Sequence, residues 1–138
     1  MSPGDVELVQ SSYASLGDDK QAMATEFYRR LFEADRSAQE LFIDGPDVMA
    51  EKFSAELAAI VEAISSFDQF ANRVRELAVR HMAYGVQTQH YHSVGVALIG
   101  ALEAHLGPMW NVDLEAAWRR AYNLVAELMM AAAATDHR

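Results

Sequence analysis

The sequence predicts an all-α domain of about seven or eight helices, and three observations support this prediction. The chain has 138 residues, which suits a single domain spanning residues 1–138. Only three prolines and seven glycines interrupt a chain rich in Ala, Leu, Glu and Met, a balance that favours helices. Apolar residues recur at spacings of three and four along most of the chain, which is the period of an amphipathic helix.

The composition excludes several classes of function. Without cysteine there is no disulfide, no thiolate nucleophile and no cysteine-held zinc or iron–sulfur cluster. A formal net charge of −9 disfavours a nucleic-acid partner, because that affinity depends mainly on neutralising phosphates. The N-terminus lacks the basic start and apolar run of a signal peptide, and no apolar stretch reaches membrane-spanning length. We therefore expect a cytoplasmic protein with no membrane span and no nucleic-acid partner.

The first third of the chain predicts two long helices and a short one. Residues 2–5, Ser-Pro-Gly-Asp, combine a cap, a proline at the first helical position and a capping-box acid, and Gly17 ends this helix. A second helix runs from about Asp19 to Asp35, with Tyr28 at the edge of its inner face. A short helical turn over residues 37–42 follows. The inner face of the second helix carries Met23, Phe27, Leu31 and Phe32.

Two helices are expected after the break at residues 43–46, Ile-Asp-Gly-Pro. We expect Asp47 to cap the first of them, and the Ser66–Gln69 pair to open the second with a capping box. The first helix presents a buried face of Met49, Phe53, Leu57, Ile60, Val61 and Ile64. The second presents one inward stripe of Phe67, Phe70, Val74, Leu77 and His81.

The end of the chain predicts two more helices. We expect Gly85 to end the preceding helix, Thr88 to cap the next, and Asp113 to cap the last after a loop at residues 107–111. The next-to-last helix points Tyr91, Val94, Leu98 and Leu102 inward. The last helix has an inner side of Leu114, Trp118, Ala121, Tyr122, Val125, Leu128 and Met129.

His81 falls on the inward stripe of its helix. Such a histidine is more often a hydrogen-bonded core residue than a metal ligand, so both interpretations stay open here. No histidine has Asp or Glu three residues before it, which excludes a di-iron carboxylate bundle. His90 and His92 point to different helix faces, and we expect both at the surface, as we do His105 and His137. A single ligand on an apolar wall suits haem, which brings its other four donors itself.

Four segments, which follow one another along the chain in the family's order, resemble the globin family. Residues 80–82, Arg-His-Met, and residues 89–95, Gln-His-Tyr-His-Ser-Val-Gly, resemble the proximal region of bacterial single-domain haemoglobins and of flavohaemoglobin globin domains. The segments at 26–32 and 40–42 are similar to the family's distal segment and to its turn with a haem-stacking phenylalanine. Ala117-Trp118 and Ala121-Tyr122 are similar to its last helix. The resemblance implies a globin fold around a haem pocket.

The resemblance also implies haem b as the cofactor and a role for each matching residue. His81 is the expected proximal iron ligand, Phe42 packs on the porphyrin, and Tyr28 reaches over the distal face to donate a hydrogen bond to a bound gas. A core aromatic is the alternative interpretation of Tyr28. The pocket is further lined by Leu77, Tyr91, Val94 and Leu98.

Counting back from His81 by the family's spacing places Met49 at the distal helical position that is often Gln or His, with Phe53 one turn later. Met49 cannot donate a hydrogen bond, which leaves Tyr28 as the expected donor. Lys52 and Arg80 flank the inward residues and are candidates for the haem propionates. Plain solvated charges remain the alternative for both.

One further departure concerns the proximal side. In flavohaemoglobins a tyrosine near the proximal histidine pairs with a glutamate late in the last helix. Tyr91 matches the tyrosine, but the expected glutamate position, eleven residues after Tyr122, is Ala133. Glu127 lies elsewhere on the helix. This weakens the case for peroxidase-like or strongly oxidative chemistry.

The expected function is reversible binding of dioxygen, and of other diatomic gases such as NO or CO, for storage, transport or scavenging. One alternative is a nitric oxide dioxygenase that needs an external reductase, because no flavin or nicotinamide domain follows the terminal AAAATDHR. A haem-based gas sensor and a haem-free interaction module are further alternatives. The sequence leaves open whether the protein is a monomer or a homodimer.

Overall fold

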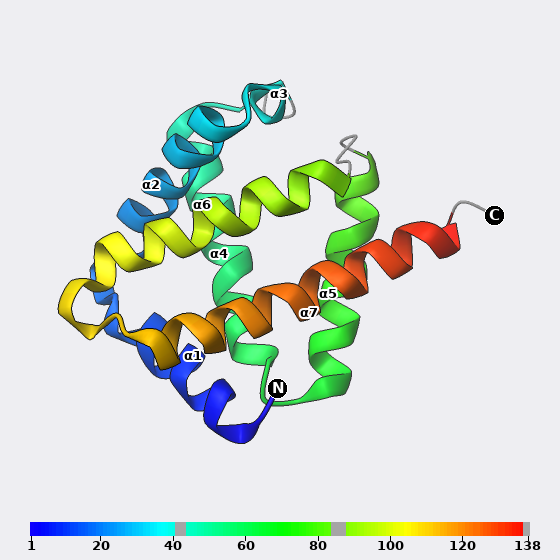
Figure 1. Ribbon diagram of the computed structural model, residues 1–138. Coiled ribbons are helices and arrows are strands. Elements are labelled where there is room, and N and C mark those ends of the chain that lie inside the picture. The colour runs from blue at the N-terminus through cyan, green and yellow to red at the C-terminus, as the bar shows by residue number, and fades with distance from the viewer. Residues whose placement is uncertain (41–43, 84–87, 137–138) are drawn as a thin grey trace.

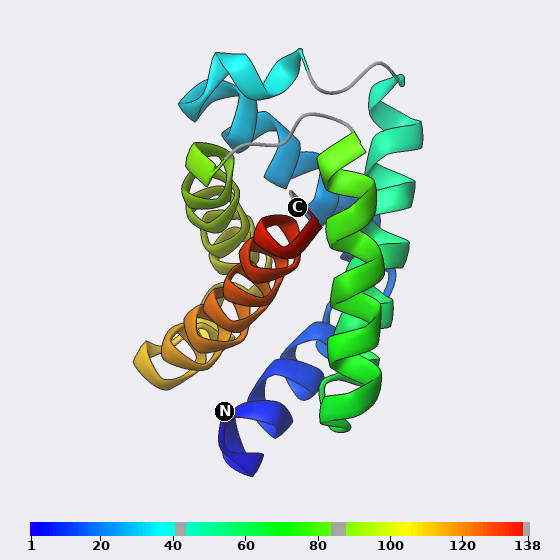
Figure 2. The ribbon, with the colours of Figure 1, turned by 90° about the vertical axis from the view of Figure 1, so that its right-hand side faces the viewer.

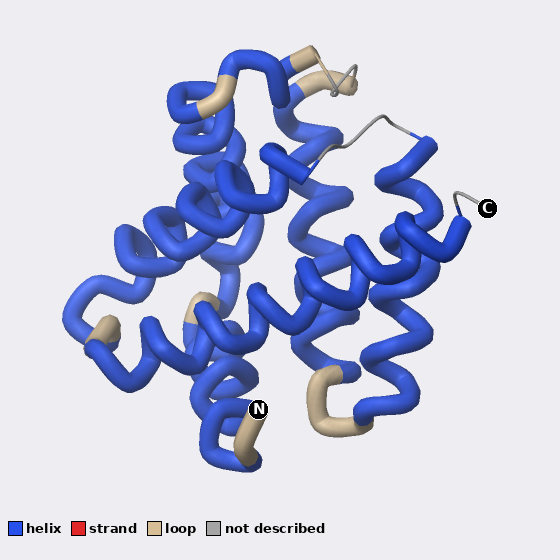
Figure 3. The backbone as a smooth tube through the Cα atoms, turned by 45° about the vertical axis from the view of Figure 1, so that its right-hand side comes forward, coloured by secondary structure: helices blue, strands red, loops and turns tan. Residues whose placement is uncertain are grey.

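The computed structural model describes residues 1–40, 44–83 and 88–136, and this part of the chain consists of seven α-helices, two short 3₁₀ helices and turns, with no strand (Figure 3). The all-α prediction is therefore confirmed for the described part. Phe42, Gly85 and His137 lie outside the described residues. The helices are α1 (Pro3–Ser15), α2 (Lys20–Ala34), α3 (Arg36–Gln39), α4 (Pro46–Ala63), α5 (Phe67–Ala83), α6 (Thr88–Leu106) and α7 (Val112–Asp136), and the 3₁₀ helices are η1 (Gly17–Asp19) and η2 (Gly107–Met109).

The boundaries of α1 follow the predicted signals. Ser2 Oγ accepts a hydrogen bond from the Asp5 amide at 3.1 Å, and the Asp5 carboxylate accepts one from the Ser2 amide at 3.2 Å. This capping box satisfies amide groups that the first helical turn leaves without a partner. Gly17 has a φ of 54°, a conformation in which glycine carries no side-chain penalty, and α1 ends just before it.

Two predicted caps are wrong, and both for the same reason. Helix α4 begins at Pro46 after Gly45, so Asp47 lies inside the first turn. Helix α7 begins after Asn111, whose Oδ1 accepts a hydrogen bond from the Leu114 amide at 2.8 Å, so Asp113 also lies in the first turn. Acidic residues are favourable both at a cap and within the first turn, where they meet the positive end of the helix dipole, so residue type alone does not separate these positions.

The helices of the described residues pack on one another across several interfaces. Helices α4 and α5 form an antiparallel hairpin, α2 packs against both α4 and α6, and α7 crosses against α1, α5 and α6 (Figures 1 and 2). No helix of the described part is both long and apolar enough to cross a membrane. The largest fully buried side chains are Phe70, Met23, Leu31, Leu102, Val9 and Val74.

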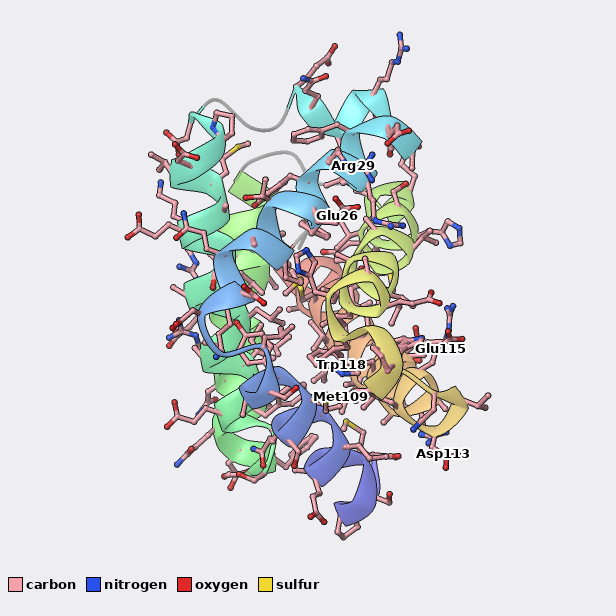
Figure 4. The ribbon with its side chains drawn as sticks, turned by 90° about the vertical axis from the view of Figure 1, so that its left-hand side faces the viewer. Glu26, Arg29, Met109, Asp113, Glu115 and Trp118 are labelled. Atoms are coloured by element: carbon pink, nitrogen blue, oxygen red, sulfur yellow. The ribbon has the colours of Figure 1, made fainter. Side chains whose placement is uncertain are left out.

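Helix α7 is held to its neighbours by two aromatic residues. Trp118 is 2% exposed, lies among the side chains enclosed by α1 and α7 (Figure 4), and donates a hydrogen bond from Nε1 to Ser12 Oγ at 2.9 Å. The Tyr122 hydroxyl donates to the carbonyl of Tyr91 on α6. A Cβ at Gly95 would lie 2.8 Å from Tyr122 Cε2, so glycine permits this close approach of α6 and α7.

His90 is not the surface residue that we expected. It is 5% exposed, and its Nε2 lies 3.3 Å from Ser37 Oγ. Ser37 donates to Asp35 at 2.6 Å, and Ser93 donates to the other oxygen of the same carboxylate at 3.2 Å. The first turn of α6 is thus covered by the corner between α2 and α3, which supplies polar partners for a buried imidazole. The surface prediction is confirmed for His92, while His105 is half-buried.

Candidate functional site

His81 lies in the last turn of α5, and its orientation is fixed by a backbone hydrogen bond. His81 Nδ1 lies 3.0 Å from the carbonyl oxygen of Leu77. A carbonyl only accepts hydrogen bonds, so Nδ1 carries the proton and the neutral ring has its lone pair on Nε2. Burial lowers the pKa of His81, which keeps the ring neutral at neutral pH. The structure therefore presents one oriented nitrogen that can bind a metal.

Tyr28 belongs to an aromatic cluster formed by α2 and α4. Its ring contacts Phe27, Phe32 and Phe53 with centroid distances of 5.0, 5.7 and 5.7 Å. Phe27 and Phe53 stack at 4.2 Å with an interplanar angle of 10° and so join the two helices. Burial raises the pKa of Tyr28 to about 12. The phenol therefore remains protonated, and a hydrogen-bond donor, over the whole physiological range.

Met49 and Phe53 share one face of α4, as their spacing predicts. Met49 is 8% exposed, whereas Phe53 is half-buried and packs against the core. A thioether accepts hydrogen bonds weakly and donates none. The described part of α4 therefore offers apolar surface at this position and no donor from Met49.

The remaining apolar residues of the predicted pocket come from α5 and α6. Leu98 is buried in the core, at 5% exposure. Leu77, Tyr91 and Val94 pack against that core but are only half-buried, although their helical spacing points them inward. Inward apolar side chains that the protein covers only in part form a wall suited to an apolar ligand. Burial also raises the pKa of Tyr91.

The two cationic residues of the predicted site have carboxylate partners. Lys52 Nζ lies 2.9 Å from Asp44 Oδ2, and Arg80 Nη2 lies 2.6 Å from Glu56 Oε1. Glu56 also forms an ion pair with Arg73. Sequence reasoning did not single out Glu56. The available signal was the spacing of Arg73 and Arg80, seven residues apart and therefore on one face of α5.

These features define a class: an all-helical protein with one oriented imidazole nitrogen beside an apolar, aromatic wall. A family model described as Globin matches residues 25–129, and the chain belongs to the globin family. Membership of this family implies haem binding. The family that the sequence motifs suggested is thereby confirmed.

Three known proteins illustrate the range of this similarity. The chain is 29% identical to neuroglobin from Danio rerio, covering 94% of this chain and 90% of that one. It is 28% identical to a flavohemoprotein from Xylella fastidiosa, covering 93% of this chain but only 33% of the longer relative. Its fold is similar to that of an engineered carbene transferase from a proposed nitric oxide dioxygenase of Rhodothermus marinus, with a TM-score of 0.88, 28% identity and coverage of 99% and 96%.

Proposed function

We propose that the protein binds haem b through His81 and binds dioxygen reversibly, together with other diatomic gases such as NO and CO. The hydrogen bond from His81 Nδ1 to the Leu77 carbonyl carries this proposal, because it fixes the orientation of the ring and leaves the lone pair that an iron ligand needs on Nε2. When bound, haem supplies an iron atom with a coordination position for the gas. A role in storage, transport or scavenging in the cytoplasm then depends on gas affinity.

The residues around His81 fit an apolar, planar cofactor. Leu77, Tyr91 and Val94 keep apolar surface that is not covered by the protein, and Phe53 adds an aromatic ring from α4. Covering this surface with a macrocycle removes it from water, which favours binding. Phe42 is proposed to stack on the same group, as the resemblance implies.

Tyr28 and Met49 are proposed to act on the gas rather than on the cofactor. Bound dioxygen carries partial negative charge, so the protonated Tyr28 phenol can donate a hydrogen bond to it and slow its release. Met49 excludes water from the same side and adds no donor. We propose Lys52 and Arg80 as partners for the haem propionates, although each already has a carboxylate partner.

The test is a set of absorption spectra of the purified protein reconstituted with haemin. Spectra are recorded in the ferric state, after reduction with dithionite, and after the reduced protein meets air. A stable oxygenated spectrum that reverts under vacuum is expected. Immediate return to the ferric spectrum would contradict reversible oxygen binding, and the absence of any haem spectrum would refute the proposal altogether.

A second candidate is nitric oxide dioxygenase activity, and the flavohemoprotein and Rhodothermus relatives favour it. In this reaction nitric oxide, dioxygen and one electron give nitrate, and the electron would come from an external flavin-containing reductase. The sequence places Ala133 where flavohaemoglobins have their late glutamate, which argues for simple gas binding. Continuous consumption of nitric oxide in the presence of a flavoprotein reductase and NADH would support the enzyme, whereas a single stoichiometric turnover would support the carrier.

A further inference from the structure

Glu56 joins α4 to the helix that presents His81. One oxygen of its carboxylate lies 2.6 Å from Arg80 Nη2, and the other contacts the guanidinium of Arg73. The two arginines are seven residues apart, so they lie on the same face of α5 about two turns from each other. A single carboxylate therefore holds the C-terminal half of α5 at two points.

This carboxylate also lies within electrostatic range of the imidazole. Arg80 directly precedes His81 in α5, so its ion pair places the carboxylate beside the helical turn that carries the imidazole. The Glu56 side chain is only 17% exposed, whereas that of Arg80 is 52% exposed. Because the carboxylate is the better shielded of the two, its charge is screened less by water and salt.

We propose that Glu56 is a positioning residue for His81, and that its negative charge lowers the reduction potential of the haem. The inference rests on the proposed function, because it assumes that His81 binds the iron. Ferric haem carries one more positive charge than ferrous haem, so a nearby carboxylate stabilises the ferric state. Arg80 acts in the opposite sense, and the ion pair between them keeps both charges beside the turn that carries His81.

The experiment compares Glu56→Gln with Glu62→Gln in the haem-loaded protein. The first change removes the charge but keeps the shape, and the second removes the same charge from an exposed site further along α4. Spectroelectrochemical titration should show a higher reduction potential for Glu56→Gln than for the wild type, with Glu62→Gln close to the wild type. Hydrogen exchange of the α5 amides from Arg73 onward, measured without haem, should become about two- to fivefold faster in Glu56→Gln only, which is the effect of losing two partly exposed ion pairs.

A potential that rises equally in both glutamate variants would overturn the inference, because it would show only a general effect of net charge. Unchanged exchange in α5 would overturn the positioning role. Arg80→Gln provides a second measurement should Glu56→Gln fail to fold: it should lower the potential and also speed exchange in α5, and a rise in potential would overturn the inference. A wild-type protein that binds no haem would refute the proposed function itself, whereas normal haem binding with an unshifted potential in Glu56→Gln would refute this inference alone.

Discussion

The two sides of the candidate haem site are built from different chemistry. On the α5 side, which we call proximal, His81 donates a hydrogen bond to the Leu77 carbonyl, and Arg80 beside it is ion-paired with Glu56. On the distal side, formed by Tyr28 of α2 and by Met49 and Phe53 of α4, the side chains are aromatic or apolar, and the Tyr28 phenol is the one donor that we assign to a bound gas.

This difference suggests a division of tasks. Directional hydrogen bonds and ion pairs fix the orientation of a ligand, so the proximal side determines how firmly the cofactor is held. Apolar packing excludes water and strengthens the few polar contacts that remain, so the distal side determines how long a gas stays bound. Each mutation below changes one side and predicts an effect on one of these two properties.

The largest effect is expected for His81→Ala, which removes the only proposed protein ligand to the iron. The variant should lose most of its haem, because the apolar wall alone gives no bond to the metal. Absorbance of the Soret band per protein after desalting measures the retained haem, and circular dichroism checks that the helices persist. His92→Ala, an exposed histidine on α6, should retain haem fully. Normal haem content in His81→Ala, with an unchanged spectrum, would disprove the proximal assignment.

Tyr28→Phe should produce the next largest effect, on the distal side. Removing a donor worth about 1.4 kcal/mol to a partly charged acceptor should speed dioxygen release roughly tenfold, while haem content stays unchanged. Stopped-flow displacement of dioxygen by carbon monoxide measures the rate. Tyr13→Phe serves as the matched control, because the Tyr13 hydroxyl donates to the Ser54 carbonyl elsewhere in the fold. Equal rates in wild type and Tyr28→Phe would show that the phenol does not reach the gas.

Much of the fold follows from the sequence because local signals and packing agree. The stripes of α2 and α4 predicted the buried residues Met23, Phe27, Leu31 and Met49, and the capping box at Ser2 set the start of α1. In these elements the residue spacing, the cap and the buried face all specify the same helix. A prediction is reliable where such local signals agree with the packing.

Apart from the two helix caps, the failures concern contacts between segments that are far apart in the sequence. His90 is buried because the α2–α3 corner covers it and Ser37 provides a partner, which the spacing of His90 and His92 alone did not show. Its position four and seven residues before Val94 and Ala97 was the missed signal, since it places His90 on an inward stripe. Glu56 was missed because its partners, Arg73 and Arg80, lie on another helix.

The smallest effect is expected for Met49→Gln, which adds a second hydrogen-bond donor to the apolar distal side and so makes it more like the polar proximal side. If Met49 lies over the gas, the new amide should share the hydrogen bonding with Tyr28 and slow dioxygen release about threefold, the effect of one neutral hydrogen bond. Met49→Leu keeps the volume and adds no donor, so its release rate should stay close to that of the wild type. Stopped-flow displacement measures the rate of dioxygen release from all three proteins under the same conditions.

Identical rates in Met49→Gln and Met49→Leu would place Met49 away from the gas. Faster release in Met49→Gln alone would mean that the amide draws the phenol of Tyr28 away from the ligand, and the distal side would then depend on having a single donor.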